Sequence, residues 1–514
     1  MAELNLSEQS IKRAIEHVKK SKDTDLFPML KEFEVFFENE VDFISELKSI
    51  DIGEYKWQSY RRFIIPKDEI SYRIAAQLDP IDTILYEAIL FEYGHLIEME
   101  RIPVSDNRVF SYRFAPTDDG QLYDKKDAWK KCWTALQDMV LFRSHVVYID
   151  IADFYNRIYH HTLENLYIRC NLPNQIQKAL KNLMQKTTQT VSQGIPIGPH
   201  ASHLLAEMCL IEIDEFLIQN DYEFCRYADD IYIFADDEIH AQIIIYQMAK
   251  LLDTCKLTMQ RNKTKIYKGI DFYGLCEKML QDDPINGLEK EMNDIINAHS
   301  DDPYSSIEYL ELSDVEQDVF SEDNLIAILN SYMEDNFDYS RIRWFYRRLS
   351  KVGVPSFLNY SLDNINKLLP AINDMALYFI SVSDNSSIIL DSQGKRLLEL
   401  LDNEIIQSNE FFQLTVLGLF GRAEKFNNIK TLLKKYSFVN EYIKREIIFS
   451  AFASKEVAWI KMIKQECTSM NEWCKRALVI ACSLLQKDER KYFLQNIAVN
   501  DLTLQLLVKY IKNK

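Results

Sequence analysis

The pattern of apolar and polar positions predicts helix at the N-terminus. Ser7 is a residue type that commonly begins helices. An apolar stripe at helical spacing follows it, formed by Ile11, Ala14, Ile15 and Val18. We therefore expect helix from Ser7 to about Lys48, with a break near Pro28.

The middle of the chain mixes strand and helix signals. Strands are predicted where apolar residues alternate or form short runs, at Arg62–Lys67, Val109–Phe114 and His145–Asp150. Two further short strands are predicted within Phe224–Phe234, folded about Ala228 and Asp229, and a basic strand-like segment after Lys256 leads to Phe272. Helices are predicted at Ile81–Glu98, at Thr162–Cys170 and after Pro199. This mixture indicates an α+β region.

The last part, from about Gly287 to Lys514, has a helical period almost throughout. Two of its apolar stripes are Tyr442, Ile443, Ile447, Ala451 and Leu478, Ala481, Cys482, Leu485. Helical segments of about 12–18 residues separated by short polar breaks are typical of an α-solenoid of HEAT-like helix pairs. A compact helical bundle is the alternative.

Composition agrees with a multidomain globular chain. Its 514 residues suffice for two to four domains, and 47% of them are hydrophobic. We predict an N-terminal helical segment over 1–50, an α+β domain over 51–280 and a helical domain over 281–514. The first residues lack the features of a secretory signal, and no apolar run approaches the roughly 18 residues of a membrane span. The nine cysteines are scattered without metal-binding spacing, which favours reduced thiols and a cytoplasmic location.

Charge is distributed unevenly. The net charge is −18, yet residues 281–340 alone hold seventeen acidic residues against one lysine. The rest of the chain is nearly neutral, which argues against a long, tight grip on duplex nucleic acid, because phosphate neutralisation by Lys and Arg supplies most non-specific affinity. The acidic segment is interpreted either as a solvated hinge with helical faces or as a mimic of DNA.

Three carboxylates at strand ends carry the candidate chemistry. Asp150 ends one apolar strand, and Asp229 and Asp230 lie at the turn between two others. Buried strands rarely tolerate such acids without a ligand. Carboxylates on a rigid platform are what Mg²⁺ requires in nucleotidyl transfer. Between these acids, a loop begins at Gln193 and Gly194 and opens a helix, and Lys263 adds a basic group downstream.

These residues resemble the ordered motifs of reverse transcriptases over roughly Arg61–Gly274. Asp150-Ile151-Ala152-Asp153-Phe154-Tyr155 resembles the A motif, and Gln193–Ser202, continuing to Ala206-Glu207, resembles the B motif. Tyr227-Ala228-Asp229-Asp230 resembles the C motif, Asn262-Lys263-Thr264 the D motif and Phe272-Tyr273-Gly274 the E motif. The resemblance implies an α+β fold with the fingers and palm of a right-hand polymerase, followed here by the helical domain.

The resemblance also implies roles for individual residues. Asp150, Asp229 and Asp230, with Ile151 beside the first, would bind two Mg²⁺ ions, with Mn²⁺ as an alternative. Tyr155 would pack under the sugar and select dNTPs, Gln193 and Gly194 would frame the nascent base pair, and Lys263 would protonate the leaving pyrophosphate. Lys67, Arg73 and Arg113 are candidates for contact with the triphosphate.

Among reverse transcriptases, the chain resembles the bacterial abortive-infection (Abi) polymerases, of the AbiK-like and prophage-borne types. The Gly-Ile-Pro-Ile-Gly-Pro form of the B motif resembles that of bacterial, not viral, reverse transcriptases. The acidic segment and the long helical array that follow the palm are similar to the arrangement in Abi polymerases. This resemblance implies antiphage defence, DNA synthesis from dNTPs without a template, priming by a protein hydroxyl with the single-stranded DNA product left attached, and a homo-oligomer. Two alternatives remain: a templated, retron-like or other defence-associated reverse transcriptase, and an inactive polymerase fold that serves as a binding scaffold.

Overall fold

The structure is a computed structural model that describes residues 3–24, 26–124, 127–189, 191–280, 286–299, 307, 309–334, 337–385, 388–426 and 428–514. Contacts divide the chain into two compact units that are not consecutive stretches of sequence. We name them the sheet unit, with Met1–Asp25, Asn39–Arg61 and Ala76–Asp282, and the helical unit, with Leu26–Glu38, Arg62–Ala75 and Asp283–Lys514. Each is described by itself.

The helices of the sheet unit are α1 (Glu8–Ser21), α3 (Glu40–Lys48), α4 (Pro80–Glu98), α5 (Ala128–Val140), α6 (Phe154–Arg157), α7 (His160–Arg169), α8 (Asn174–Thr187), α9 (Ala201–Met208), α10 (Ile211–Gln219), α11 (Glu238–Thr254) and α12 (Gly269–Leu280). Its four strands are β3 (His145–Asp150), β4 (Phe224–Tyr227), β5 (Asp230–Ala235) and β6 (Lys265–Lys268). Of the helices predicted here, α4, α7 and α9 are confirmed within a few residues. The helical stretch predicted from Ser7 to about Lys48 is interrupted more than expected: α1 ends at Ser21, and separate helices span Glu32–Glu38 and α3.

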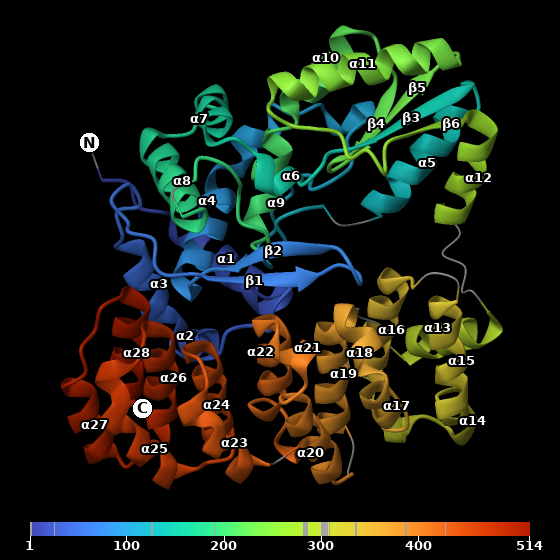
Figure 1. The fold of residues 1–514 in the computed structure, drawn as a ribbon. Helices are drawn as coiled ribbons and strands as arrows, with labels where there is room; N and C mark the ends of the chain where they lie inside the picture. Colours follow the sequence, from blue (N-terminus) through green and yellow to red (C-terminus); the bar gives the residue numbers. More distant parts are fainter. Residues whose placement is uncertain are drawn as a thin grey trace. The chain divides into compact units, whose positions relative to one another are not determined.

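The four strands form one antiparallel sheet in the order β4-β5-β3-β6. Helix α11 packs against one face, and α5 and α12 cover the other (Figure 1). The buried cluster on the second face includes Trp133, Cys225, Tyr232 and Phe272. Because both faces are covered, the two central strands β3 and β5 are apolar along most of their length, whereas the edge strand β6 is largely exposed.

Two expectations for this region differ from the structure. Val109–Phe114 was predicted as a strand, but it makes only isolated bridges, at Val109 and Phe114. Tyr112 within it has a positive φ of 44°, which interrupts an extended chain. The strand-like segment predicted to lead to Phe272 already ends at Lys268, as the short strand β6. The residues Phe272-Tyr273-Gly274 lie on helix α12.

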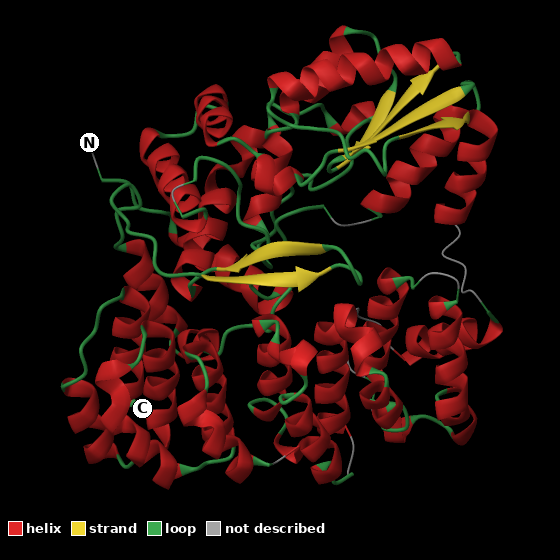
Figure 2. Ribbon diagram, viewed as in Figure 1, coloured by secondary structure: helices red, strands yellow, loops and turns green. Residues whose placement is uncertain are grey.

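Strands β1 (Arg61–Pro66) and β2 (Tyr72–Gln77) form a separate two-stranded ribbon. Figure 2 shows the ribbon as an isolated pair of arrows. Phe63 and Ile65 are buried and Ile64 is exposed, so successive side chains point to opposite faces, as in any strand. The turn is closed by a bond from the Lys67 backbone N–H to the Ser71 carbonyl (2.9 Å). The tip of the ribbon belongs to the helical unit.

The helical unit holds α2 (Glu32–Glu38), α13 (Gly287–His299), α14 (Asp314–Val319), α15 (Glu322–Met333), α16 (Tyr339–Val352), α17 (Leu358–Asp363), α18 (Ile365–Leu368), α19 (Ile372–Asn385), α20 (Asp391–Leu400), α21 (Glu404–Gln407), α22 (Glu410–Phe420), α23 (Ile429–Lys435), α24 (Glu441–Ala453), α25 (Val457–Ile463), α26 (Glu472–Ala481), α27 (Lys487–Gln495) and α28 (Leu502–Asn513). From α16 to α28 the larger helices pack one against the next in chain order, as Figure 1 shows. The predicted C-terminal array of helices is confirmed.

Residues from the N-terminal half complete the helical unit. Helix α2 packs against α26 and α28. Its Glu32 is fully buried and accepts hydrogen bonds from both terminal nitrogens of Arg445, at 2.7 and 2.9 Å. At the ribbon tip, Arg343 donates to the Lys67 carbonyl and Asn409 donates to the Ile64 carbonyl (3.0 Å). Side chains of the array therefore hold the backbone of the ribbon.

Two further observations concern predictions about environment. None of the helices in the described part of the chain is long and apolar enough to cross a membrane. All nine cysteines are free, and eight of them are buried.

Within the acidic segment 281–340, the described residues form α13, α14 and α15, while 281–285, 300–306, 308 and 335–336 lie outside the described residues.

Candidate active site

The three predicted carboxylates meet at the ends of β3 and β5, the two central strands of the four-stranded sheet. Asp150, the last residue of β3, is the direct partner of Asp230, the first residue of β5. Asp229 precedes Asp230 in the turn that joins β4 to β5. This turn is tight because Ala228 adopts a left-handed conformation with a φ of 51°. The predicted fold-back about Ala228 and Asp229 is confirmed, and it brings two strand ends and three acids together.

Neighbouring side chains fix two of these acids. Lys263 lies two residues before β6, the strand that pairs with β3, and its Nζ is 2.6 Å from Oδ2 of Asp150. Tyr148, two residues before Asp150, donates its hydroxyl to Oδ1 of Asp230 at 2.6 Å. Ile151 is buried and makes a bridge with Met259. The sheet therefore presents the carboxylates with their orientation set.

The protonation behaviour of the acids reflects their crowding. Burial raises the pKa of Asp229 to about 6, and the charges of Asp230 and Asp150 act in the same direction. Burial and the charge of Asp150 also raise the pKa of Asp230, although the bond from Tyr148 opposes this. Burial acts to lower the pKa of Lys263, but its bond with Asp150 and the nearby acids raise it. Carboxylates that repel one another at one point are a donor set suited to hard divalent cations such as Mg²⁺.

A buried polar network supports the turn from behind. Oγ of Ser111 accepts a hydrogen bond from the Ala228 N–H (2.7 Å) and donates to Oε1 of Glu207 (2.5 Å). Arg226 donates to Oε2 of Glu207 (2.9 Å) and to the Ala228 carbonyl (3.0 Å). Asp214 pairs with the same guanidinium. Ser111, Glu207 and Arg226 are almost completely buried, so this network is protected from water.

Sequence reasoning did not identify Ser111 or Arg226 as contributors to the site. The available signal was Arg226, a guanidinium inside an apolar strand, which requires buried carboxylate partners. Arg113, predicted to contact the triphosphate, instead lies in an adjoining buried cluster. Its Nη2 is 2.5 Å from Glu98 and 2.9 Å from the Ile102 carbonyl.

The predicted substrate residues of the A and B motifs lie together. The Ile195 N–H donates to the Tyr155 carbonyl (2.9 Å), and the Gly194 N–H donates to the Ile158 carbonyl (2.7 Å). Gly194 has a φ of 96°, which favours glycine at this position. Gln193 forms a bridge with Tyr159. The loop is thus fastened to the segment that follows Asp150.

The ring of Tyr155 has a defined neighbour. Its hydroxyl lies 2.7 Å from Nδ1 of His203, on α9. The His203 ring stacks on Tyr112, with centroids 4.1 Å apart and an interplanar angle of 7°. Burial raises the pKa of Tyr155 well above its usual value. The hydroxyl therefore stays protonated and the ring is held in place.

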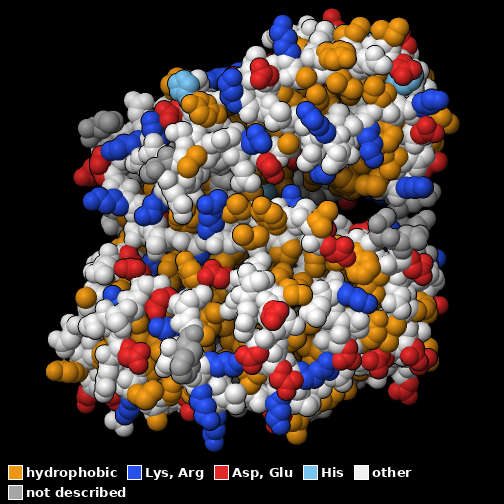
Figure 3. Space-filling view, in the orientation of Figure 1, with side chains coloured by type: hydrophobic (Ala, Val, Ile, Leu, Met, Phe, Trp, Pro, Cys, Tyr) orange, Lys and Arg blue, Asp and Glu red, His pale blue; other side chains and the backbone are white. Residues whose placement is uncertain are grey.

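Lys67 and Arg73, the other two predicted triphosphate contacts, belong to the helical unit. Lys67 is exposed at the turn of the ribbon, and Arg73 is half-buried on β2. On the face shown in Figure 3, the described Lys and Arg side chains are interspersed with acidic and apolar ones and form no continuous basic patch. This agrees with the nearly neutral charge outside the acidic segment.

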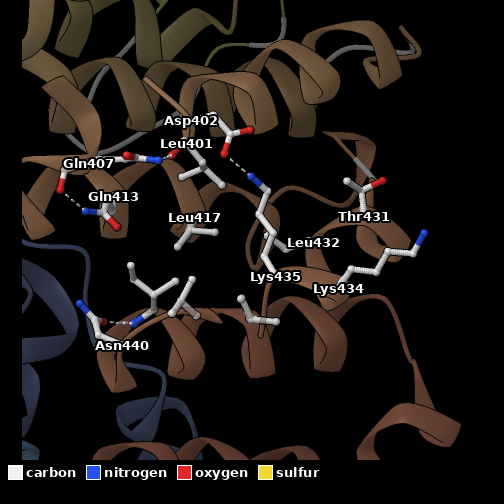
Figure 4. Close-up of a pocket in the computed structure, with 13 residues that line it drawn as sticks. Leu401, Asp402, Gln407, Gln413, Leu417, Thr431, Leu432, Lys434, Lys435 and Asn440 are labelled. Carbon is white, nitrogen blue, oxygen red and sulfur yellow. Dashed lines mark hydrogen bonds and ion pairs between the residues drawn. The ribbon is translucent and has the colours of Figure 1, made fainter. Parts of the chain in front are cut away.

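A cavity of about 650 Å³ lies within the helical unit, among α20–α24. Leu417 and Leu432 lie in the middle of its apolar wall (Figure 4). At its rim, Lys435 pairs with Asp402, and Nε2 of Gln413 donates to the Gln407 carbonyl (2.8 Å). These polar groups are engaged with one another, so the cavity presents a mainly apolar wall.

Comparison with known proteins identifies the domain that carries the acids. Residues 109–277 match the family model described as reverse transcriptase (RNA-dependent DNA polymerase). A solved structure of telomerase from Candida albicans, in complex with a TWJ fragment of telomeric RNA, is similar over 80% of this chain and 70% of that chain, with 12% identity and a TM-score of 0.30. No curated protein matches the chain. Residues 109–277 therefore form a domain of the reverse-transcriptase type, a nucleotidyltransferase domain that contains all three carboxylates and Lys263.

Proposed function

We propose that the protein is an antiphage abortive-infection DNA polymerase that joins dNTPs without a template and uses a protein hydroxyl as primer. The observation that supports polymerase activity is the pairing of Asp150 with Asp230 at the ends of two neighbouring strands, with Asp229 beside them. These acids would hold two Mg²⁺ ions, or Mn²⁺, which supply charge stabilisation for the attacking hydroxyl and the leaving pyrophosphate.

The chain's own residues would do the rest. Tyr148 orients Asp230, and the Ser111 network fixes the turn that carries Asp229. Lys263 holds a proton on Nζ next to Asp150 and would give it to the pyrophosphate. Tyr155 would lie under the sugar and select a dNTP, while Gln193 and Gly194 would border the new base pair.

Two properties of the chain support untemplated synthesis. The part outside the acidic segment is nearly neutral, so it lacks the charge that a long duplex grip needs. The chain also continues into a helical array, a feature shared with the Abi polymerases that it resembles. That resemblance is also the basis for proposing antiphage defence, a homo-oligomer and a cytoplasmic location.

Tyr55, Tyr60 and Tyr72, in the N-terminal and fingers region, are candidates for the priming hydroxyl, and the surroundings of Tyr55 and Tyr72 differ. Tyr55 is buried and donates its hydroxyl to Asp82 at 2.8 Å, which makes it a poor nucleophile. Burial and the charge of Asp82 also raise its pKa well above the usual value. Tyr72, on β2, is 59% exposed. Of these two, we propose Tyr72 as the better priming candidate.

The test uses nuclease-treated protein with Mg²⁺ and labelled dNTPs, without template or primer. Products are boiled in SDS and separated on a denaturing gel. We expect label that migrates with the protein, that is lost in Asp229→Ala, and that persists in Asp253→Ala, a control at an exposed position on α11. Label that appears only with an added RNA or DNA template, free of protein, would replace this proposal with a templated polymerase. No incorporation under either condition would favour the binding scaffold.

A further inference from the structure

Three buried side chains converge at a second point of the sheet unit, apart from the three carboxylates. They are His17 on α1, Glu87 on α4 and His200 directly before α9. One potential metal-binding atom from each lies within 4.8 Å of the others. All three side chains are at most 6% exposed. Residues separated by up to 183 positions in sequence thus bring nitrogen and oxygen donors to one place.

The hydrogen bonds of His17 define its tautomer. Nδ1 lies 2.7 Å from the Gly120 carbonyl oxygen, which can only accept, so Nδ1 carries the proton. In the neutral ring, Nε2 therefore presents a lone pair. Histidines that bind metals commonly donate their other N–H to a backbone carbonyl, which orients the ring in this way.

His200 and Glu87 are oriented as well. Nδ1 of His200 lies 2.8 Å from Nε2 of His17, so it donates its proton to that lone pair. Oε1 of Glu87 accepts a hydrogen bond from the Ala201 N–H (2.8 Å), which fixes the carboxylate.

A second carboxylate lies close to this group. Asp23 is 4% exposed and near enough to His200 for their charges to interact. Its Oδ2 accepts a hydrogen bond from Gln77 (3.1 Å), whereas its Oδ1 has no hydrogen-bond partner among the described residues. A buried oxygen without a donor is costly, and a bound cation would satisfy it.

We propose that His17, Glu87 and His200 form a structural site for a divalent transition-metal ion, with Zn²⁺ as its natural occupant. Two imidazoles and one carboxylate are a donor set that Zn²⁺ accepts, whereas Mg²⁺ prefers oxygen ligands only. On binding, the ion takes the lone pair of His17 Nε2. His200 changes tautomer at the same time: its proton moves from Nδ1 to Nε2, so that Nδ1 also offers the ion a lone pair and the ring stays neutral. The ion would join α1 and α4 to the start of α9.

This site does not depend on the proposed polymerase activity. We expect the bound ion to hold the loop before α9 in place. His203, the partner of Tyr155, lies only three residues after His200. The test must therefore separate the site from ions held by the strand-edge carboxylates. A full-length Asp229→Ala, Asp230→Ala chain serves as the background, because it lacks two of those three acids.

The experiment measures bound metal in this background after growth with Zn²⁺ and dialysis against metal-free buffer. Elemental analysis is expected to find about one Zn²⁺ per chain, and Co²⁺ exchange is expected to give the visible absorption of a low-coordinate nitrogen and oxygen site. Adding Glu87→Gln should remove the metal and lower Tm. Glutamine keeps the acceptor for Ala201, so this variant is expected to fold.

Glu92→Gln on the same helix is the matched control, because Glu92 accepts bonds from Ser7 and Ser10 and is not part of the cluster. It should retain the metal. Chains without stoichiometric metal, or equal metal in the Glu87→Gln and control chains, would overturn the proposal. The group would then be held by hydrogen bonds alone.

Discussion

Tyr148 and Asp230 are joined by a hydrogen bond of 2.6 Å between the tyrosine hydroxyl and carboxylate Oδ1, across neighbouring strands β3 and β5. Tyr148 also stacks on Tyr232, with ring centroids 5.0 Å apart. The bond selects one orientation for a carboxylate that two other acids repel. Tyr148 is therefore a positioning residue for the candidate metal ligand next to it.

Tyr148→Phe keeps the stacked ring and removes only this bond. We expect nucleotide incorporation to fall by about 10- to 100-fold, with a higher Mg²⁺ requirement, as is usual when a partner of a metal ligand is lost. Rates measured across a Mg²⁺ titration test this. Tyr267→Phe, on β6 of the same sheet, should leave both quantities unchanged. Equal effects of the two substitutions would show that the bond has no special role.

Ser111→Ala tests the network behind the turn. The change leaves the Ala228 N–H without its acceptor, at a cost of about 1–3 kcal/mol, and frees the left-handed turn that carries Asp229. We expect kcat to fall about 10-fold or more, with KM for dNTP little changed. Ser361→Ala removes an equally buried serine from the helical unit and is the control for loss of stability. A shift confined to KM would contradict the positioning role.

Tyr155→Val is expected to relax sugar selection. The smaller side chain removes the ring that would lie under the sugar, so incorporation of rNTPs relative to dNTPs should rise by about 10-fold or more. Tyr155→Phe loses only the bond to His203 and should keep dNTP preference. Competition assays with paired rNTPs and dNTPs measure both. If the phenylalanine variant also accepts rNTPs, selection depends on the hydroxyl and not on the ring.

Glu32→Gln is predicted to destabilise the helical unit. It would leave the Arg445 charge buried without its carboxylate, which costs about 3–5 kcal/mol. Glu38→Gln, on the same helix but in an exposed pair with Lys514, should cost less than about 1 kcal/mol. Denaturant unfolding of both variants gives these values.

The same pair makes stability depend on pH. Burial acts to raise the pKa of Glu32, but the charge and hydrogen bonds of Arg445 hold it below the usual 4.5. A lowered pKa means that the stabilisation is present above pH 4.5 and is lost as the pH falls below it. Unfolding free energies between pH 6 and 3 should therefore fall more steeply in the wild-type chain than in Glu32→Gln. Parallel curves would exclude this contribution.

The sequence by itself determined the local elements and the identity of the three acids. The runs that end at Asp150 and at Asp229 are sufficient to predict a strand and a turn, because these local structures depend on residues only a few positions away. The apolar stripes after Gly287 predicted the helical array for the same reason. The strand predicted at 109–114 was wrong because alternation does not report buried polar partners: Ser111 and Arg113 lie inside with Glu207 and Glu98, and Tyr112 between them has a positive φ.

Tertiary structure alone decided which groups meet. Strand register aligns Asp150 with Asp230 and brings Lys263 to Asp150 across 113 positions of sequence. The packing behind the sheet brings Ser111 to Ala228 across 117 positions. The assignment of the ribbon tip to the helical unit rests likewise on contacts between distant segments. Hydrophobic periodicity is a local property and carries no information on such pairings, because they are fixed by the burial of whole surfaces and by the need to satisfy each buried charge.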